Sequence, residues 1–173
     1  AVKDYYNVNP DLADDPSHRL EEFKSLIQRT HNAGLKLLID IVPNHGADDY
    51  VLMKDFPEGF LTDENSTDVR KEPDWSDVTD FNFDELRIRQ HLKNVFLYWI
   101  KEFDIDGYRC DVAGLVPYDF WHELIGELKR LKPDIYLLAE WEDPEILLTG
   151  FHSDYGWTEY HDLLDIRLKN QRT

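Results

Sequence analysis

Residues 105–113 read Ile-Asp-Gly-Tyr-Arg-Cys-Asp-Val-Ala, a short apolar run that is broken by charged residues near its end. Two other runs share this character. Residues 35–42 read Leu-Lys-Leu-Leu-Ile-Asp-Ile-Val and continue into Pro-Asn-His, and residues 135–142 read Ile-Tyr-Leu-Leu-Ala-Glu-Trp-Glu. Short runs of this kind are typical of strands that are buried on both faces. We therefore expect three buried strands, each followed by polar side chains.

Amphipathic segments separate and flank these runs. Apolar residues recur at helical spacing over 18–33, over about 86–103 and over 117–133. Strands that alternate with helices of this length indicate strand–helix units and a parallel sheet. A fourth, weaker strand is expected near 153–157, followed by a helical start over 159–170. The predicted fold class is α/β.

The polar strand ends are unevenly spaced. Asp111 and Glu140 lie 29 positions apart, about one strand–helix repeat, whereas Asp40 and Asp111 lie 71 positions apart. The excess falls in residues 46–85, which are rich in turn formers and acids and have little periodicity. Long loops of this kind are usually functional or disordered, and loops after the carboxyl ends of strands build the active sites of α/β barrels. We expect an inserted loop region over 46–85.

Composition narrows the class of function. The 173 residues include 19 Lys and Arg against 36 Asp and Glu, which gives a formal net charge of −17. This balance argues against nucleic-acid and membrane-surface partners, which need clustered Lys and Arg, and no run approaches the roughly 20 apolar residues of a membrane span. A neutral, hydroxyl-rich ligand such as a sugar is compatible, because carboxylates accept its hydrogen bonds. We expect a soluble protein; the sequence does not indicate its compartment.

Charged side chains at the same end of three strands indicate a site, because a carboxylate in an apolar strand is costly to bury unless it is paired or functional. Arg109 and Asp111 stand two apart on one strand and share a face, where the guanidinium would keep the carboxylate ionised as a nucleophile requires. Glu140 follows apolar residues, and partial desolvation would raise its pKa and suit it to protonate a leaving group. Carboxylates on neighbouring strands fit the ~5–5.5 Å separation of retaining glycosidases.

Taken in order, these motifs resemble the conserved regions of the alpha-amylase superfamily of glycoside hydrolases, which act on alpha-glucans. Asp40-x-x-x-Asn44-His45 is similar to its first region, Gly107-Tyr108-Arg109-x-Asp111 to its second, and Ala139-Glu140-Trp141 to its third. Asp80-Phe81-Asn82 is similar to the region near the end of the family's B domain, and Asp4-Tyr5-Tyr6 to the tail after strand two. The resemblance covers essentially the whole chain.

The resemblance implies catalytic roles for three residues. Asp111 would be the nucleophile that forms a glycosyl-enzyme, Glu140 the general acid/base, and Arg109 the group that positions Asp111. His45 would donate hydrogen bonds to the sugar, and Asp40 would hold the loop at the same substrate subsite. The implied activity is retaining hydrolysis, or transglycosylation, of an alpha-glucan or maltooligosaccharide substrate in carbohydrate metabolism.

The resemblance also implies binding roles. Tyr5 or Tyr6 would stack on a sugar ring. Asn44 is a calcium ligand in many members of the family, so calcium is an optional ligand and no cofactor is required. Gly114 and Leu115 stand where many amylases carry Lys and His that contact substrate and calcium.

The implied fold is a partial (β/α)8 TIM barrel that runs from about the end of strand two to strand six. In this interpretation residues 1–173 form a truncated catalytic barrel domain, with a B-domain-like insertion after strand three at 46–85. The family's fourth region, an Asn-His-Asp after strand seven, is absent, because Tyr160-His161-Asp162 follows Glu140 too closely to match it. An open arc of strands has unpaired edges, so self-association is expected.

Two other interpretations stay open. The first is a catalytically incompetent barrel fragment that retains the fold and at most weak sugar binding. The second is a metal-dependent hydrolase built on Asp40, His45 and Asp111, although transition-metal sites usually show several His residues. The sequence flanking residues 1 and 173 would test the first interpretation, and metal analysis would test the second.

Overall fold

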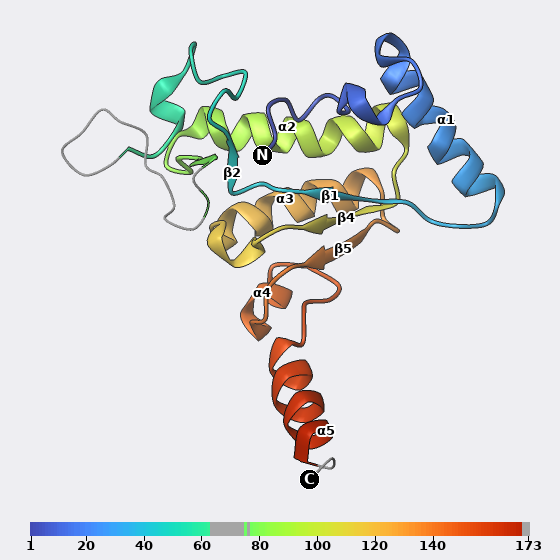
Figure 1. Cartoon of the computed structure of the whole chain (residues 1–173). Helices are drawn as coiled ribbons and strands as arrows, with labels where there is room; N and C mark the ends of the chain where they lie inside the picture. Colours follow the sequence, from blue (N-terminus) through green and yellow to red (C-terminus); the bar gives the residue numbers. More distant parts are fainter. Residues whose placement is uncertain (63–74, 76, 171–173) are drawn as a thin grey trace.

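A computed structural model describes residues 1–62, 75 and 77–170 of the chain (Figure 1). Its centre is a sheet of three parallel strands in the order β1-β4-β5. These strands are β1 at Leu38–Ile41, β4 at Gly107–Cys110 and β5 at Tyr136–Ala139. The α/β class and the parallel sheet predicted from the three apolar runs are therefore confirmed.

Three helices accompany this sheet: α1 at Arg19–Asn32, α2 at Leu86–Phe103 and α3 at Tyr118–Leu131. Helices α2 and α3 pack against each other and run along the sheet in Figure 1. Each presents a buried stripe at helical spacing, made on α2 by Ile88, Leu92, Val95, Phe96 and Trp99, and on α3 by Phe120, Trp121, Leu124, Ile125 and Leu128. Burial of these stripes is the main force that holds the helices to the sheet.

The strands are shorter than the apolar runs that predict them. Strand β1 begins at Leu38, because the backbone N–H of Leu37 is taken by the side chain of Asp106. Strand β4 ends at Cys110, and two residues later Val112 adopts a left-handed backbone that turns the chain out of the sheet. The prediction of a strand at 153–157 is wrong for the described residues, where the pairing is a single parallel bridge between Ser153 and Leu138.

The region between β1 and α2 contains a second, smaller sheet. Strand β2 at His45–Ala47 pairs antiparallel with β3 at Val78–Asp80, and a short 3-10 turn, η3, lies at Pro57–Gly59. Its aromatic side chains are buried together, namely Tyr50, Phe56, Phe60 and Phe81. Residues 63–74 and 76 of the predicted insertion lie outside the described residues, so a domain over 46–85 stays a prediction.

Short elements complete the chain. Four of them are 3-10 or α-helical turns, η1 at Pro10–Leu12, η2 at Pro16–His18, η4 at Ala113–Leu115 and α4 at Pro144–Leu148. A π-helical segment, η5 at Glu159–Asp165, continues into α5 at Ile166–Asn170 and extends away from the sheet (Figure 1). In the part of the chain that the structure describes, no helix combines the length and the apolar composition needed to cross a membrane.

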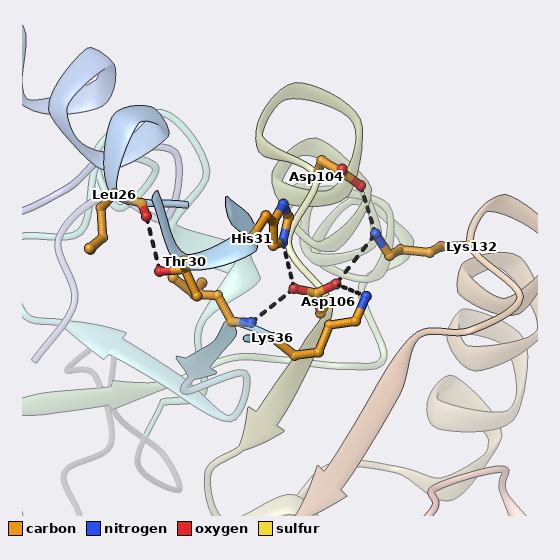
Figure 2. A network of polar contacts seen from close by, with 8 residues as sticks. Leu26, Thr30, His31, Lys36, Asp104, Asp106 and Lys132 are labelled. Carbon is orange, nitrogen blue, oxygen red and sulfur yellow. Dashed lines mark hydrogen bonds and ion pairs between the residues drawn. The ribbon is translucent and has the colours of Figure 1, made fainter. Parts of the chain in front are cut away.

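One buried carboxylate fastens the amino end of the sheet (Figure 2). Asp106 lies just before β4 and is 4% exposed. It accepts hydrogen bonds of 2.8 Å from His31 Nε2, Lys36 Nζ and Leu37 N–H, and Lys132 Nζ lies 4.0 Å away. Burial raises the pKa of Asp106, but the bonds from Lys36, Leu37 and His31 outweigh it and lower the pKa to about 2. The carboxylate thus ties α1, β1, β4 and α3 together at one point.

Candidate active site

The charged ends of the three parallel strands meet around one guanidinium. Arg109 on β4 is in register with Asp40 on β1 and with Leu138 on β5. Its Nη1 donates to both oxygens of Asp40 at 2.9 and 3.1 Å and to Oδ1 of Asp111 at 2.6 Å. Its Nη2 lies 2.5 Å from Oε1 of Glu140. The structure therefore brings together four of the residues that the sequence singled out.

Formal charge at this cluster is unbalanced, with three carboxylates around one cation. The side chains of Arg109, Asp111 and Glu140 are largely buried, whereas that of Asp40 is exposed. Burial opposes the charge on Arg109, but hydrogen bonds with Tyr155, Asp40 and Asp111 raise the pKa of the guanidinium. A permanently charged Arg109 holds the carboxylates in place and leaves a negative surplus beside them.

Glu140 is held by two different donors. Oε1 faces Arg109, and Oε2 accepts the backbone N–H of Val112 at 3.0 Å. Burial raises the pKa of Glu140, the bond from Val112 lowers it, Asp111 raises it and Arg109 lowers it, and the net shift is upward. The direction and the leading cause agree with the expectation from the apolar residues before Glu140. A carboxyl with a raised pKa suits proton donation at the pH of catalysis.

Val112 contacts the candidate site at a position that was not singled out from the sequence. Its φ of 39° and ψ of 43° are left-handed, which is strained for a β-branched residue. Neighbouring bonds keep it there: Ala113 N–H donates to the carbonyl of Glu140 at 3.3 Å, and Trp121 Nε1 donates to the carbonyl of Ala113 at 2.9 Å. This turn directs the Val112 N–H at Glu140. Nothing in the residue type signals it, since glycine or asparagine is the usual choice for such a backbone.

Tyr155 is the second position that the sequence did not single out. Arg109 Nε donates to its hydroxyl oxygen at 3.3 Å, and the guanidinium carbon lies 5.9 Å from the centre of its ring. Tyr155 follows the bridge between Ser153 and Leu138, so it stands beyond β5 at the same edge of the sheet. In the sequence, Tyr155 could have been noticed because it lies within the strand that was expected near 153–157.

Asn44 and His45 lie at the start of β2 and are both buried. The ring of His45 lies 5.6 Å from the ring of Trp75, and Asn44 Nδ2 donates to Oδ1 of Asp80 at 3.1 Å. Calcium at Asn44 stays a prediction.

A transition-metal site on Asp40, His45 and Asp111 gains no support from the donors that the structure describes. Asp40 and Asp111 both bind the guanidinium of Arg109. Across residues 1–62, 75 and 77–170, no group of three or more His, Cys, Asp or Glu side chains is arranged to hold a metal ion. The cation that Asp40 and Asp111 share is the guanidinium of Arg109.

The two tyrosines predicted to stack on sugar have different surroundings. Tyr5 is 5% exposed, and its hydroxyl donates to the carbonyls of Val42 and His45, the latter at 2.6 Å. It therefore supports the turn between β1 and β2. Tyr6 is half-buried, with its ring edge-on to His91 at 5.8 Å and to Tyr98 at 5.0 Å. Sugar stacking on Tyr5 or Tyr6 stays a prediction.

The chain is similar in sequence to curated glucan-active enzymes. A cyclomaltodextrinase of Geobacillus thermopakistaniensis is 30% identical over 167 residues, which cover 87% of this chain and 28% of that protein. An intracellular maltogenic amylase of Bacillus subtilis is 31% identical over 180 residues, which cover 90% of this chain and 29% of that protein. The chain thus spans less than a third of these relatives. No protein-family model matches it.

Solved structures agree with the sequence relatives. A noncanonic maltogenic alpha-amylase from Thermotoga neapolitana matches with a TM-score of 0.84 at 38% identity, over 95% of this chain and 37% of that one. An alpha-amylase from Lactobacillus plantarum matches with a TM-score of 0.85 at 34% identity, over 95% of this chain and 41% of that one. With the motifs in order and the carboxylates gathered at the strand ends, the chain belongs to the alpha-amylase superfamily.

Proposed function

We propose that this chain carries the catalytic carboxylates of a retaining alpha-glycoside hydrolase or transglycosylase that acts on alpha-glucans or maltooligosaccharides. The single observation that carries the proposal is the shared guanidinium, since Asp111 and Glu140 bind Nη1 and Nη2 of Arg109. Carboxyls that share one guanidinium are close together, which favours the ~5–5.5 Å separation of retaining enzymes over the wider separation of inverting ones. The names of the relatives support the substrate class.

In the first step, a carboxylate oxygen of Asp111 attacks the anomeric carbon of the bound sugar. The bond from that carbon to the glycosidic oxygen breaks, and protonated Glu140 gives its proton to that oxygen. The products are a glycosyl ester on Asp111, a free leaving sugar and ionised Glu140. Arg109 holds Asp111 in place and orients it for the attack.

In the second step, ionised Glu140 takes a proton from a water molecule as the water oxygen attacks the anomeric carbon. The ester bond breaks, Asp111 returns as a carboxylate, and Glu140 regains its proton. A sugar hydroxyl in place of water gives transfer instead of hydrolysis. The surplus negative charge around Arg109 stabilises the positive charge that develops on the sugar ring in both steps.

We also propose that the chain is part of a barrel fold. The sheet β1-β4-β5 is an arc of a (β/α)8 barrel within a catalytic barrel domain, and residues 46–85 are a B-domain-like insertion after β1. The pairing of β2 with β3 near the two ends of that insertion supports its treatment as one unit. His45 and Asp40 contact the substrate at the mouth of the barrel.

Covalent trapping tests the proposal. The full natural polypeptide is incubated with a fluorinated maltosyl fluoride, whose slow second step lets the glycosyl-enzyme accumulate, and the labelled peptide is mapped by mass spectrometry. We expect one added glycosyl group on Asp111. Labelling of another residue, or hydrolysis of maltotetraose with inversion at the anomeric carbon, would contradict the retaining mechanism.

A further inference from the structure

A series of ring contacts leads from helix α2 to the turn that carries His45, and we call His91, Tyr50 and Tyr5 the aromatic column. His91 lies on α2, and its Nε2 is 2.5 Å from the hydroxyl oxygen of Tyr50. The rings of Tyr50 and Tyr5 lie 5.6 Å apart at 57°. Both tyrosines are buried, whereas His91 is half-buried. The column therefore joins α2 to the turn between β1 and β2.

One end of the column supports the candidate site. The Tyr5 hydroxyl donates to the carbonyls of Val42 and His45, which lie on either side of the turn between β1 and β2. Burial raises the pKa of Tyr5 most, and Tyr50 and Asp111 raise it further, so the charge of the proposed nucleophile reaches Tyr5. Tyr5 thus holds the backbone that presents His45, close to Asp111.

Tyr50 also packs against this backbone directly. A Cβ atom at Gly46, the residue after His45, would lie 3.1 Å from both Cγ and Cδ2 of Tyr50. These distances are shorter than ordinary van der Waals contact, so a side chain at Gly46 would have to push the ring away by a few tenths of an ångström. The position of the Tyr50 ring therefore bears on the backbone one residue from His45.

The hydroxyl of Tyr50 anchors this ring to α2. Burial raises the pKa of Tyr50, so the phenol keeps its proton at neutral pH. Burial also lowers the pKa of His91 and outweighs Asp4, which raises it, so the imidazole is neutral. The Tyr50 hydroxyl therefore donates to Nε2 of His91. A second bond holds α2 to the column, since Trp99 Nε1 donates to the carbonyl of Tyr5 at 2.8 Å.

We propose that His91 is a positioning residue for substrate binding, which acts through Tyr50 to hold His45 in place for the sugar. The inference rests on the proposed function, in which His45 contacts the substrate. Apolar packing keeps the Tyr50 ring buried, but a hydrogen bond is directional and also fixes how the ring is turned. A binding group must be held to within about 0.5 Å of its productive position, so this fixation bears on affinity and rate as well as on stability.

Steady-state kinetics of the full natural polypeptide with maltotetraose test the inference, at a temperature where every variant is folded. Tyr50→Phe and His91→Phe each remove the hydrogen bond and keep an aromatic ring, and we expect either to lower kcat/KM about threefold to tenfold. His91→Gln can still accept from the Tyr50 hydroxyl, so it should stay within about twofold of the wild type. Tyr98→Phe is the matched control, because it removes a tyrosine hydroxyl from α2 outside the column, and it should leave kcat/KM unchanged.

A double-mutant cycle separates positioning of His45 from a purely structural role. His45→Ala should lower kcat/KM, and adding Tyr50→Phe to it should lower kcat/KM by less than a further twofold, because no imidazole is left to position. An unchanged kcat/KM in Tyr50→Phe or in His45→Ala, or a full additional loss in the double variant, would overturn the inference while the glycosidase activity stands. A wild-type protein that does not turn over maltotetraose would overturn the proposed function and, with it, the inference.

Discussion

The two ends of β4 carry opposite charge arrangements. At the amino end, the single buried carboxylate of Asp106 receives hydrogen bonds from His31, Lys36 and the Leu37 N–H (Figure 2). At the carboxyl end, a few residues along the same strand, the one guanidinium of Arg109 is shared by three carboxylates. At the amino end of β4, several hydrogen-bond donors surround one carboxylate. At the carboxyl end, three carboxylates surround one cation.

We infer that this difference in charge separates a network that stabilises the fold from the cluster that we propose to be catalytic. A buried carboxylate that accepts three hydrogen bonds is well satisfied and ties four elements together. A cluster with surplus negative charge is ready to stabilise a developing positive charge on a bound sugar. We infer that the amino end supplies stability and that the carboxyl end gives up some stability for activity.

The largest expected effect is on catalysis at the carboxyl end. Asp111→Asn should abolish formation of the covalent intermediate, because the amide cannot act as the nucleophile. Glu140→Gln should lose roughly 10²–10⁴-fold in kcat on maltotetraose, which is the usual contribution of general acid catalysis. Both are measured by steady-state kinetics of the full natural polypeptide.

Maltosyl fluoride separates the two roles. Fluoride needs little protonation to leave, so this donor should restore much of the first-step rate in Glu140→Gln and none in Asp111→Asn. Equal rescue of both variants would show that the nucleophile and the acid have been assigned wrongly.

The next effect concerns stability at the amino end. Asp106→Asn removes the buried charge and leaves Lys36 and His31 without their carboxylate. We expect the free energy of unfolding to fall by about 2–3 kcal/mol, measured by urea denaturation at neutral pH. Asp104→Asn is the control, because Asp104 is largely exposed in its pair with Lys132 and should change the free energy by less than about 1 kcal/mol. Similar losses in both variants would remove the special role of Asp106.

The contribution of Asp106 should also be visible in the pH dependence of the free energy of unfolding. The pKa of Asp106 is lowered to about 2 in the folded chain, below its ordinary value of 3.8. Its contribution is therefore present above about pH 4 and is lost as the pH falls from about 4 to about 2. Urea denaturation across this range should show a steeper loss of stability in the wild type than in Asp106→Asn. Parallel curves of stability against pH for the wild type and Asp106→Asn would contradict the lowered pKa of Asp106.

The smallest effect is at Val112. Val112→Gly keeps the N–H that faces Glu140 and relieves the left-handed strain, while glycine adds entropy to the unfolded chain. We expect the free energy of unfolding to rise by up to about 1 kcal/mol with little change in kcat. Val112→Ala keeps most of the strain and should not gain this stability. A marked destabilisation by glycine would show that Val112 is held by packing rather than strained.

The elements with the clearest periodicity were predictable from the sequence. Residues 86–103 form the helix that the apolar spacing indicates, and the three apolar runs form the parallel sheet. The errors lie where side chains compete with the backbone or where pairing is slight. Asp106 takes the Leu37 N–H and delays β1, and the expected strand at 153–157 keeps only the Ser153 bridge.

The site was predictable in part, for a similar reason. Four site residues could be identified from the sequence, because charged residues at the ends of apolar strands are unusual. These are Asp40, Arg109, Asp111 and Glu140. Val112 and Tyr155 could not be identified in this way, because their roles depend on a backbone angle and on a contact between distant segments. Asp106 also lies at the end of an apolar strand, and only its donors in space show that its role is structural.

The most direct test of the account is the sign of two stability changes measured side by side. Burial raises the pKa of Glu140, so the ionised form of Glu140 lowers the stability of the folded chain at neutral pH. If the charge of Glu140 is removed, Arg109 still binds the carboxylates of Asp40 and Asp111. Urea denaturation at neutral pH should therefore show that Glu140→Gln leaves the free energy of unfolding unchanged or raises it, whereas Asp106→Asn lowers it by about 2–3 kcal/mol. A loss of similar size in both variants would contradict the claim that one end of β4 serves stability and the other serves catalysis.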